Sequence, residues 1–431
     1  MASPALRVLA AAAAALVVAG EQPPPPCRDR WLQPFSPASI WNTAIGASAR
    51  FVHAQIYTSA FNYSYGCALR ASAANRRVSC KAPGTSGKTP EAACVAAGCC
   101  YVGSPRPQCF IPAGGVPDAG VHADQDVLVR AGPADPPTPF LERAWRGGAE
   151  CAQGGAQRGS VPFPPALMVD CEDNNNAFAL LLPDNVTLLQ SQPLYRAAPG
   201  APIMAQWPPA GPAGFMAGWN ISILGEGAAG AHGGSFLSSI GGTIRAGELT
   251  AGAIPHALKL EVFGKDYYWP GRTGPACFAW PASACDGYGN SSGWNGYAGL
   301  VPEVRPGALL AVPSALAGPL AARLATAPAR TILAALVTYG GYLVDDTAGD
   351  SAAVCAEPAA IAELQSAFGI SINITRPALA SSAGASGAFF RDVVAIFQSL
   401  HAVANNAPGS VGGGGAPLAP PAPPLCDAPP S

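Results

Sequence analysis

Six of the thirteen cysteines in this 431-residue chain crowd between positions 67 and 109, and this density is the strongest constraint on its fold. They are Cys67, Cys80, Cys94, Cys99, Cys100 and Cys109. So short a segment cannot bury enough apolar surface to offset its conformational entropy, so covalent cross-links must stabilise it. Six cysteines allow fifteen pairings, and spacing alone does not choose among them.

The order of these cysteines resembles that of a P-type trefoil domain, over residues 65–112. The resemblance rests on Gly98-Cys99-Cys100-Tyr101, on Arg76-Arg77 before Cys80, and on the closing Cys109-Phe110. It implies the disulfides Cys67–Cys100, Cys80–Cys99 and Cys94–Cys109. It also implies a module that holds its protein at a glycan-rich surface, as trefoil domains do beside the catalytic domains of some glycosidases.

The N-terminus predicts export. Residues 1–20 read as a secretory signal peptide, in which Arg7 precedes an apolar run over residues 9–18 and small residues follow at 18–20. The run is too short for a convincing membrane span, so we expect a secreted, extracellular protein without stable membrane insertion. Five N-glycosylation sequons agree with this route; they begin at Asn62, Asn185, Asn220, Asn290 and Asn373.

Charge and cysteine spacing narrow the function classes. A net charge of −2 with 12% charged residues argues against nucleic acid as a partner. Outside the trefoil segment, Cys277 with Cys285 and Cys151 with Cys171 are the expected pairs. One of Cys27, Cys355 and Cys426 must then stay unpaired or pair with another chain. None of these cysteines has a zinc-like spacing with histidine, so the sequence predicts no metal site and no cofactor.

The chain divides by composition into further segments. Residues 21–64 form an extended lead-in with strand character, residues 113–164 are Gly-, Pro- and Ala-rich and predicted to be irregular, and residues 412–431 form a Pro/Gly-rich, disordered tail that Cys426 could tie down. The main domain spans residues 165–411. Its short apolar or alternating runs, at 177–182, 185–189, 221–224 and 254–263, are typical of an antiparallel sheet.

Helical periodicity enters only near the C-terminus. We expect helices over residues 328–339, 357–368 and 387–405, with a strand at 342–347 after the first. In the strand at 254–263, His256, Leu258, Leu260 and Val262 should share one face and Lys259 and Glu261 the other. The predicted class is mainly β, with a β-sandwich or jelly-roll-like core, a few peripheral C-terminal helices and the small disulfide-rich trefoil. The pattern argues against a doubly wound α/β fold and a TIM barrel.

The densest polar signal runs from His232 to His256. Glycines beside His232 let backbone approach a ligand, a histidine could act as general base, and Arg245 could neutralise a substrate carboxylate. Glu248 and His256 complete the candidate set. The alternative is structural: the Gly-Gly pairs mark turns, Arg245 pairs with Glu248, and His256 faces a core.

A second candidate is Asp345-Asp346 at the end of the strand at 342–347. Neighbouring strand residues point to opposite faces, so at most one of them should enter a shared pocket. Glycoside hydrolysis would need a second carboxylate, from Glu248, Glu261, Asp266 or Asp170. Alternatively, the two aspartates are turn or cap residues.

Aromatic residues gather in the following Gly-rich region. Tyr267, Tyr268, Trp269 and Trp294, with Trp280, Tyr288 and Tyr297 nearby, could stack on sugar rings or could cover a small core. Residues 232–261, 339–347 and 405–410 resemble a group of uncharacterised secreted microbial proteins, a resemblance that implies no mechanism. The motifs of serine esterases, P-loop proteins and HExxH metalloproteases are missing.

The leading hypothesis is therefore a carbohydrate-active enzyme whose partners are extracellular polysaccharides or glycoprotein glycans. A polysaccharide lyase would use His232 or Tyr267 as base and Arg245 as charge neutraliser. A glycoside hydrolase would use Glu248 or Glu261 together with Asp345 or Asp346. The alternatives are a non-catalytic lectin and a matrix, storage or cell-wall protein.

Overall fold

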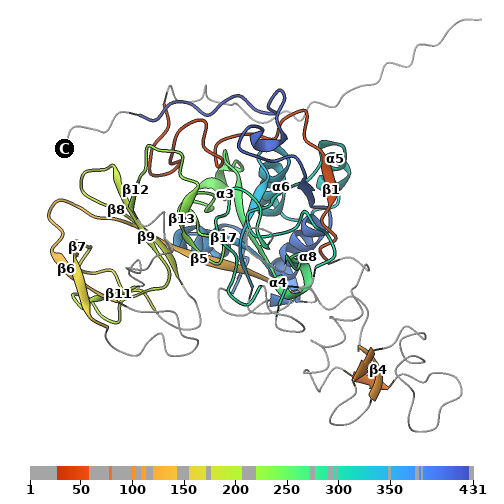
Figure 1. The fold of residues 1–431 in the computed structure, drawn as a ribbon, viewed down its shortest axis with the longest axis horizontal. Coiled ribbons are helices and arrows are strands. Elements are labelled where there is room, and N and C mark those ends of the chain that lie inside the picture. Colours follow the sequence, from red (N-terminus) through yellow and green to blue (C-terminus); the bar gives the residue numbers. More distant parts are fainter. Residues whose placement is uncertain are drawn as a thin grey trace, which may run out of the picture.

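The computed structural model describes residues 27–57, 77–79, 100–102, 108–112, 120–142, 155–170, 176–205, 220–271, 277–289, 296–297, 299–347, 351–373, 378–379 and 382–426. Within these ranges the largest element is a mixed sheet of eleven strands (Figure 1). Its order is β1 (Phe51–His53), β19 (His401–Val403), β15 (Leu309–Ala311), β16 (Gly341–Asp346), β14 (Leu258–Val262), β17 (Ser351–Ala356), β5 (Gly120–Arg130), β8 (Ala177–Leu181), β9 (Thr187–Ser191) and β12 (Asn220–Ser222), with β18 (Ala378–Leu379) paired to β5.

The centre of this sheet mixes parallel and antiparallel pairs. The pairs β14–β16, β17–β5 and β5–β8 are parallel, while β14–β17 and β8–β9 are antiparallel. The expectation of an antiparallel sheet is therefore wrong in the middle. Parallel neighbours need long crossover connections, and the chain between β14 and β16 supplies one that contains three helices.

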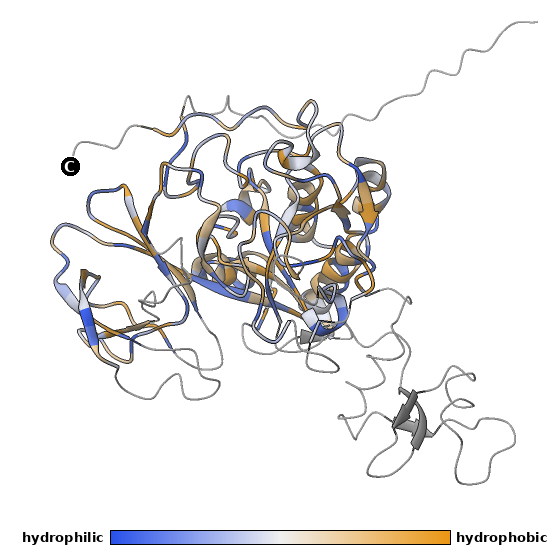
Figure 2. Ribbon diagram, viewed as in Figure 1, coloured by the Kyte–Doolittle hydropathy of each residue, from blue (hydrophilic) through white to orange (hydrophobic). Residues whose placement is uncertain are grey.

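The helices cover one face of the large sheet. They are α3 (Glu248–Ala251), α4 (Gly264–Tyr267), α5 (Ser314–Ala321), α6 (Ala327–Thr338), α7 (Pro358–Phe368) and α8 (Gly384–Gln398). Leu336 of α6 and Phe390 of α8 pack with Leu260, Leu343 and Val354 of the central strands in one buried core. Figures 1 and 2 show α5, α6 and α8 gathered on one side and mostly apolar.

Two of the three predicted helices are confirmed, and their ends have ordinary causes. Both α6 and α7 have proline in the first turn, and α7 ends at Gly369, whose left-handed backbone closes the last turn. The third helix was predicted too long. α8 ends at Gln398, and His401–Val403 turns back as strand β19 to pair with β1 and β15.

A second, smaller sheet gives the molecule its sandwich-like part. It consists of β10 (Leu194–Tyr195), β11 (Ile203–Ala205), β6 (Pro137–Glu142) and β7 (Gln157–Pro162). Phe140 and Ile203 from this sheet share a buried core with Val127, Phe178 and Leu180 from the large one. The mainly β class is thus confirmed, and residues 120–142 and 155–164, predicted to be irregular, contain three strands.

On the face opposite the helices, irregular backbone covers the large sheet. Trp41, from the N-terminal segment, is buried edge-on against Tyr342 of β16, with ring centroids 5.3 Å apart. The same segment continues into β1, so it belongs to the main sheet. The C-terminal tail is ordered as far as Cys426, which forms a disulfide with Cys27, so the expectation of a disordered tail is wrong for residues 412–426.

Within residues 65–112, β2 (Arg77–Ser79), β4 (Gln108–Pro112) and β3 (Cys100–Val102) form a three-stranded antiparallel sheet. Cys67, Cys80, Cys94 and Cys99 lie outside the described residues, as do Cys151 and Cys171, so those pairings remain predictions. The bridge Cys277–Cys285 is confirmed, and Cys355 is the free cysteine of the described part of the chain. Among the described helices, none combines the length and apolarity that crossing a bilayer requires.

Candidate functional site

Ionisable side chains line the helix-free face of the four central strands. Alternation along β14 sends Leu258, Leu260 and Val262 into the helix-side core and Lys259 and Glu261 to the opposite face, as predicted from the sequence. On the same face, Cys355 of β17 lies directly across from Asp124 of β5, with Asp126 one alternate position further along. All five polar residues are buried.

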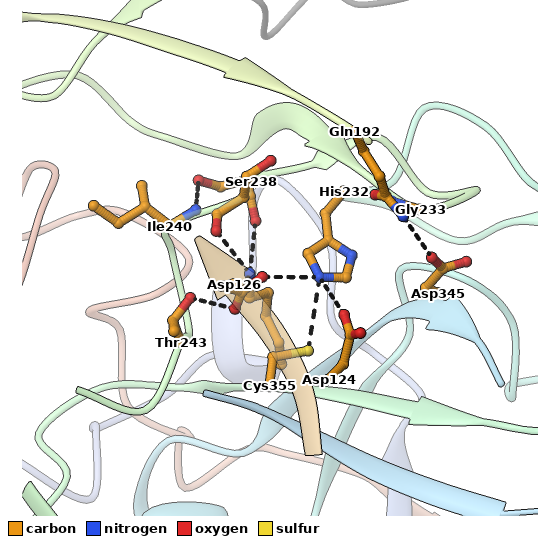
Figure 3. Close-up of polar contacts among 12 residues, drawn as sticks. Asp124, Asp126, Gln192, His232, Gly233, Ser238, Ile240, Thr243, Asp345 and Cys355 are labelled. Carbon is orange, nitrogen blue, oxygen red and sulfur yellow. Dashed lines mark hydrogen bonds and ion pairs between the residues drawn. The ribbon is translucent and has the colours of Figure 1, made fainter. Parts of the chain in front are cut away.

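His232, at the end of β13 (Ala229–His232), lies over this row and is fully buried. Figure 3 shows three side chains converging on its Nε2 atom. The distances from Nε2 are 3.3 Å to Asp124 Oδ2, 3.2 Å to Asp126 Oδ1 and 3.7 Å to Cys355 Sγ. The Cys355 thiol lies in turn 3.6 Å from Glu261 Oε1. We call Asp124, His232, Glu261 and Cys355 the His–Cys cluster; one donor atom from each lies within 4.8 Å of the others.

Lys259 neutralises the neighbouring Asp126. Its Nζ atom lies 2.8 Å from Asp126 Oδ2 and donates to the carbonyl oxygens of Ser238 and Ser239. Thr243 donates its hydroxyl to the same Asp126 oxygen at 2.7 Å. Asp126 is therefore held by Lys259 and Thr243, and the His–Cys cluster borders this ion pair.

The pKa values in the cluster diverge because one buried space holds several acids. Burial, then the charges of Asp124 and Asp345, raise the pKa of Glu261 well above its usual range, and burial followed by Glu261 does the same for Cys355. For His232, burial and Lys259 lower the pKa, but hydrogen bonds to Asp124 and Asp126 outweigh them and raise it. Burial would raise the pKa of Asp124, yet contact with His232 lowers it.

Beside it lies a second group, the aspartate cluster, formed by Asp286, Asp345 and Asp346. One carboxylate oxygen of each lies within 4.8 Å of the others. Asp345 is buried, whereas Asp286 and Asp346 are half-buried. The expectation that only one of Asp345 and Asp346 enters a shared site is wrong, because a register shift between Leu260 and Glu261 interrupts the β14–β16 pairing and β16 ends at Asp346.

Tyrosines and backbone amides hold the aspartate cluster. Tyr297 donates its hydroxyl to Asp286 at 2.6 Å, and Tyr288 donates to Asp346. The Gly234 amide donates to Asp345 Oδ1 at 3.2 Å. A side chain is impossible at Gly233 without movement, because a Cβ atom there would lie 2.1 Å from the Asp345 carboxyl carbon. The glycines after His232 thus allow backbone to approach carboxylates of the protein itself.

Mutual repulsion and burial weaken the acids of this cluster. Burial, followed by the charge of Asp286, raises the pKa of Asp345 to about 7. Burial, then Asp286 and Asp345, raise the pKa of Asp346 well above its ordinary value, and burial raises that of Asp286. The three acids therefore compete for protons, and each ionises less readily than an isolated aspartate.

The other predicted catalytic residues form a network of their own. Arg245 donates to Glu357 at 3.0 Å, and its guanidinium lies over the Trp31 ring. Glu248 accepts from the Arg245 backbone amide at 2.7 Å and lies 3.0 Å from His256 Nε2. The structural alternative is therefore right that these side chains are engaged within the protein and that His256 is buried. The partner it gave to Arg245 is wrong, because the guanidinium pairs with Glu357 and not with Glu248.

The predicted aromatic platform is divided. Tyr268 is buried, donates to the Asp345 carbonyl oxygen and packs edge-on against Tyr297, so it supports the aspartate cluster from within. Tyr267 is half-buried and packs against Tyr57 at 5.8 Å, while Trp269 is half-buried. Trp294 lies outside the described residues.

Sequence reasoning did not single out Asp124, Asp126, Lys259, Asp286 or Cys355 as site residues. A signal for the first two exists: His122, Asp124 and Asp126 alternate with Val121, Ala123 and Val127 along β5. Asp286 directly follows Cys285, and the sequence indicated only a disulfide to Cys277 at this point of the chain. No family model, curated protein or solved structure matches the chain.

Proposed function

We propose that this protein is a secreted carbohydrate-active enzyme, a glycoside hydrolase acting on extracellular polysaccharide or glycoprotein glycans, with the aspartate cluster as its catalytic site. The observation that carries the proposal is the meeting of Asp286, Asp345 and Asp346, with oxygens within 4.8 Å and with Asp286 and Asp346 partly accessible to solvent. Retaining glycoside hydrolysis uses one protonated and one ionised carboxyl group at such short range.

The roles follow from exposure and charge. Asp346 has a pKa well above its ordinary value and is half-buried, so it suits the general acid that protonates the glycosidic oxygen. Asp286, which accepts a hydrogen bond from Tyr297, suits the carboxylate that attacks the anomeric carbon. A spacing of about 5 Å between two such carboxyl groups is typical of retaining enzymes. Asp345 is buried beside them, and its charge helps to raise the pKa of Asp346.

The hydrolase is favoured over the lyase because the lyase residues are engaged elsewhere. Arg245 is bound by Glu357 and by the Trp31 carbonyl oxygen, so it is not available to neutralise a substrate carboxylate. His232, the last residue of β13, is fully buried. Support for a glycan substrate comes from Tyr288 beside the cluster, from the signal peptide and from the resemblance of residues 65–112 to a trefoil domain.

The test is digestion of a panel of neutral and acidic polysaccharides by the protein secreted from a eukaryotic host. We expect new reducing ends without unsaturated products, and at least about 10²-fold less of them from Asp286→Asn and Asp346→Asn. Asp135→Asn, in the loop between β5 and β6, is the matched control and should retain activity.

Unsaturated products would assign a lyase, and glycan binding without cleavage would assign a lectin. Either result contradicts the proposal. Full activity in both Asp→Asn variants would contradict the assigned site.

A further inference from the structure

We propose that the His–Cys cluster is a structural zinc-type site, in which Asp124, His232, Glu261 and Cys355 bind one divalent transition-metal ion. This inference goes beyond the proposed hydrolase and does not depend on it. It starts from the donor set, since carboxylate oxygen, imidazole nitrogen and thiolate sulfur are the three ligand types that Zn²⁺ takes in proteins.

The separations of the donor atoms match the edges of a coordination tetrahedron. With metal–sulfur bonds of about 2.3 Å and metal–nitrogen and metal–oxygen bonds of about 2.1 Å, tetrahedral neighbours lie about 3.4 Å apart for nitrogen and oxygen and about 3.6 Å apart when sulfur is one of them. The observed values are 3.3 Å for His232 Nε2 to Asp124 Oδ2, 3.7 Å for Cys355 Sγ to His232 Nε2, and 3.6 Å for Cys355 Sγ to Glu261 Oε1.

Hydrogen bonding does not account for this arrangement. Nε2 of His232 can carry one proton, yet Asp124, Asp126 and Cys355 all face it (Figure 3). Asp124 Oδ2 is buried 3.3 Å from His232 Nε2, and apart from this ion-pair contact no donor among the described residues reaches it in hydrogen-bond geometry. Polar atoms in such a place are normally satisfied, and an ion in the centre would satisfy this one.

Charge supports a divalent cation. As metal ligands, Asp124, Glu261 and Cys355 would be deprotonated and would bring three negative charges into a space closed to solvent, where unpaired charges are strongly disfavoured. Lys259 cannot balance them, because Asp126 already engages its ammonium group at 2.8 Å. A doubly charged ion would leave a net charge of about −1 on the four ligands and the metal.

The site would be structural, because all four residues are buried and no open ligand position faces solvent. Its ligands come from β5, β13, β14 and β17, so the ion would attach the β13 segment to three strands of the large sheet. Sequence spacing did not indicate it, since the nearest two ligands in the chain, His232 and Glu261, stand on different elements.

The test is metal content and ligand spectroscopy on the full secreted chain. Elemental analysis should find close to one zinc ion per chain. After removal with a chelator, added Co²⁺ should give tetrahedral d–d bands and a thiolate-to-cobalt charge-transfer band. Cys355→Ser should lose the charge-transfer band and bind zinc at least about tenfold more weakly. His256→Gln, the control at the separate His256–Glu248 pair, should retain both.

The results separate the alternatives even where a variant folds poorly, because the first measurements use the unmodified protein. A wild-type chain that holds no zinc and takes up neither Zn²⁺ nor Co²⁺ overturns the proposal. So does Co²⁺ binding without the thiolate band, or with that band unchanged in Cys355→Ser. Metal content that is lost in Asp346→Asn but kept in Cys355→Ser would place the ion in the aspartate cluster instead.

Discussion

Trp41 explains why the Gly241-Gly242 pair lacks side chains. The indole is fully buried, donates Nε1–H to the Gly227 carbonyl at 2.7 Å and rests on both glycines. A Cβ atom at Gly241 would lie 2.3 Å from Trp41 Nε1. The pair is thus a packing surface for an aromatic ring from the N-terminal segment, which the sequence alone could present only as a turn.

At this position we predict a steric cost. Gly241→Ala should lower the free energy of unfolding by about 1–3 kcal/mol, because the added methyl group must displace a ring that has no free space. Gly409→Ala, at an exposed turn with open space around the Cβ position, should change it by less than about 0.5 kcal/mol. Urea denaturation of both variants decides the point, and equal effects would contradict the proposed packing.

The residues of the site were only partly predictable, because their contacts join positions far apart in the chain. His232, Asp345 and Asp346 stood out because glycines or a doubled charge marked them. Asp124 and Cys355 stand in stretches rich in Ala and Val, and nothing local distinguishes a buried ionisable side chain there from a solvated one. Their meeting depends on the parallel pairing of β17 with β5, which joins positions far apart in the chain.

Elements with strong local signals were the predictable ones. Proline in the first turn and glycine after the last marked α7, and the period-2 pattern of β14 assigned each of its faces. β5 was missed because its neighbours in sequence are Gly- and Pro-rich, although its own residues alternate. α8 was extended too far because the residues of β19 also fit the helical spacing, while pairing with β1 and β15 selects the strand.

The short helix α3 provides a prediction about pH. His256 is buried with Nε2 3.0 Å from Glu248 and Nδ1 2.9 Å from the Ala257 carbonyl oxygen, so the doubly protonated ring can donate to both. Burial lowers the pKa of His256, but Glu248 outweighs it and raises the pKa above its ordinary value.

A raised pKa means that protonation stabilises the folded state. The contribution of His256 is therefore complete below pH of about 6.5 and is lost as pH rises through the folded pKa. Between about pH 6.5 and the folded pKa of His256, the free energy of unfolding of the wild type should therefore fall more steeply than that of His256→Gln. The difference in slope should reach up to about 1.4 kcal/mol per pH unit. Denaturation at a series of pH values measures this difference, and parallel profiles for wild type and His256→Gln would refute it.

At the scale of the whole molecule, the two ends of the described chain close on each other. Arg28 pairs with Leu425 in a parallel bridge, donates its amide to Pro424 and accepts from the amide of Cys426. The disulfide Cys27–Cys426 lies beside these contacts and spans 399 residues. From the sequence, any two of Cys27, Cys355 and Cys426 could have formed this bridge. The structure buries Cys355 in the sheet as a free thiol, so Cys27 pairs with Cys426.

This long bridge should stabilise the molecule more than the short one. In the chain-entropy description, closing 399 residues restricts the unfolded state by roughly 6 kcal/mol, against roughly 2.5 kcal/mol for the eight residues between Cys277 and Cys285. We therefore expect Cys27→Ser/Cys426→Ser to lower the free energy of unfolding by more than Cys277→Ser/Cys285→Ser, as measured by chemical denaturation without reductant. A larger loss in the Cys277→Ser/Cys285→Ser variant would show that local packing, and not chain closure, governs how these bridges act. The large sheet agrees with the expected order: β1 and β19 pair at one of its edges, so the bridge reinforces a contact between segments from opposite ends of the described chain.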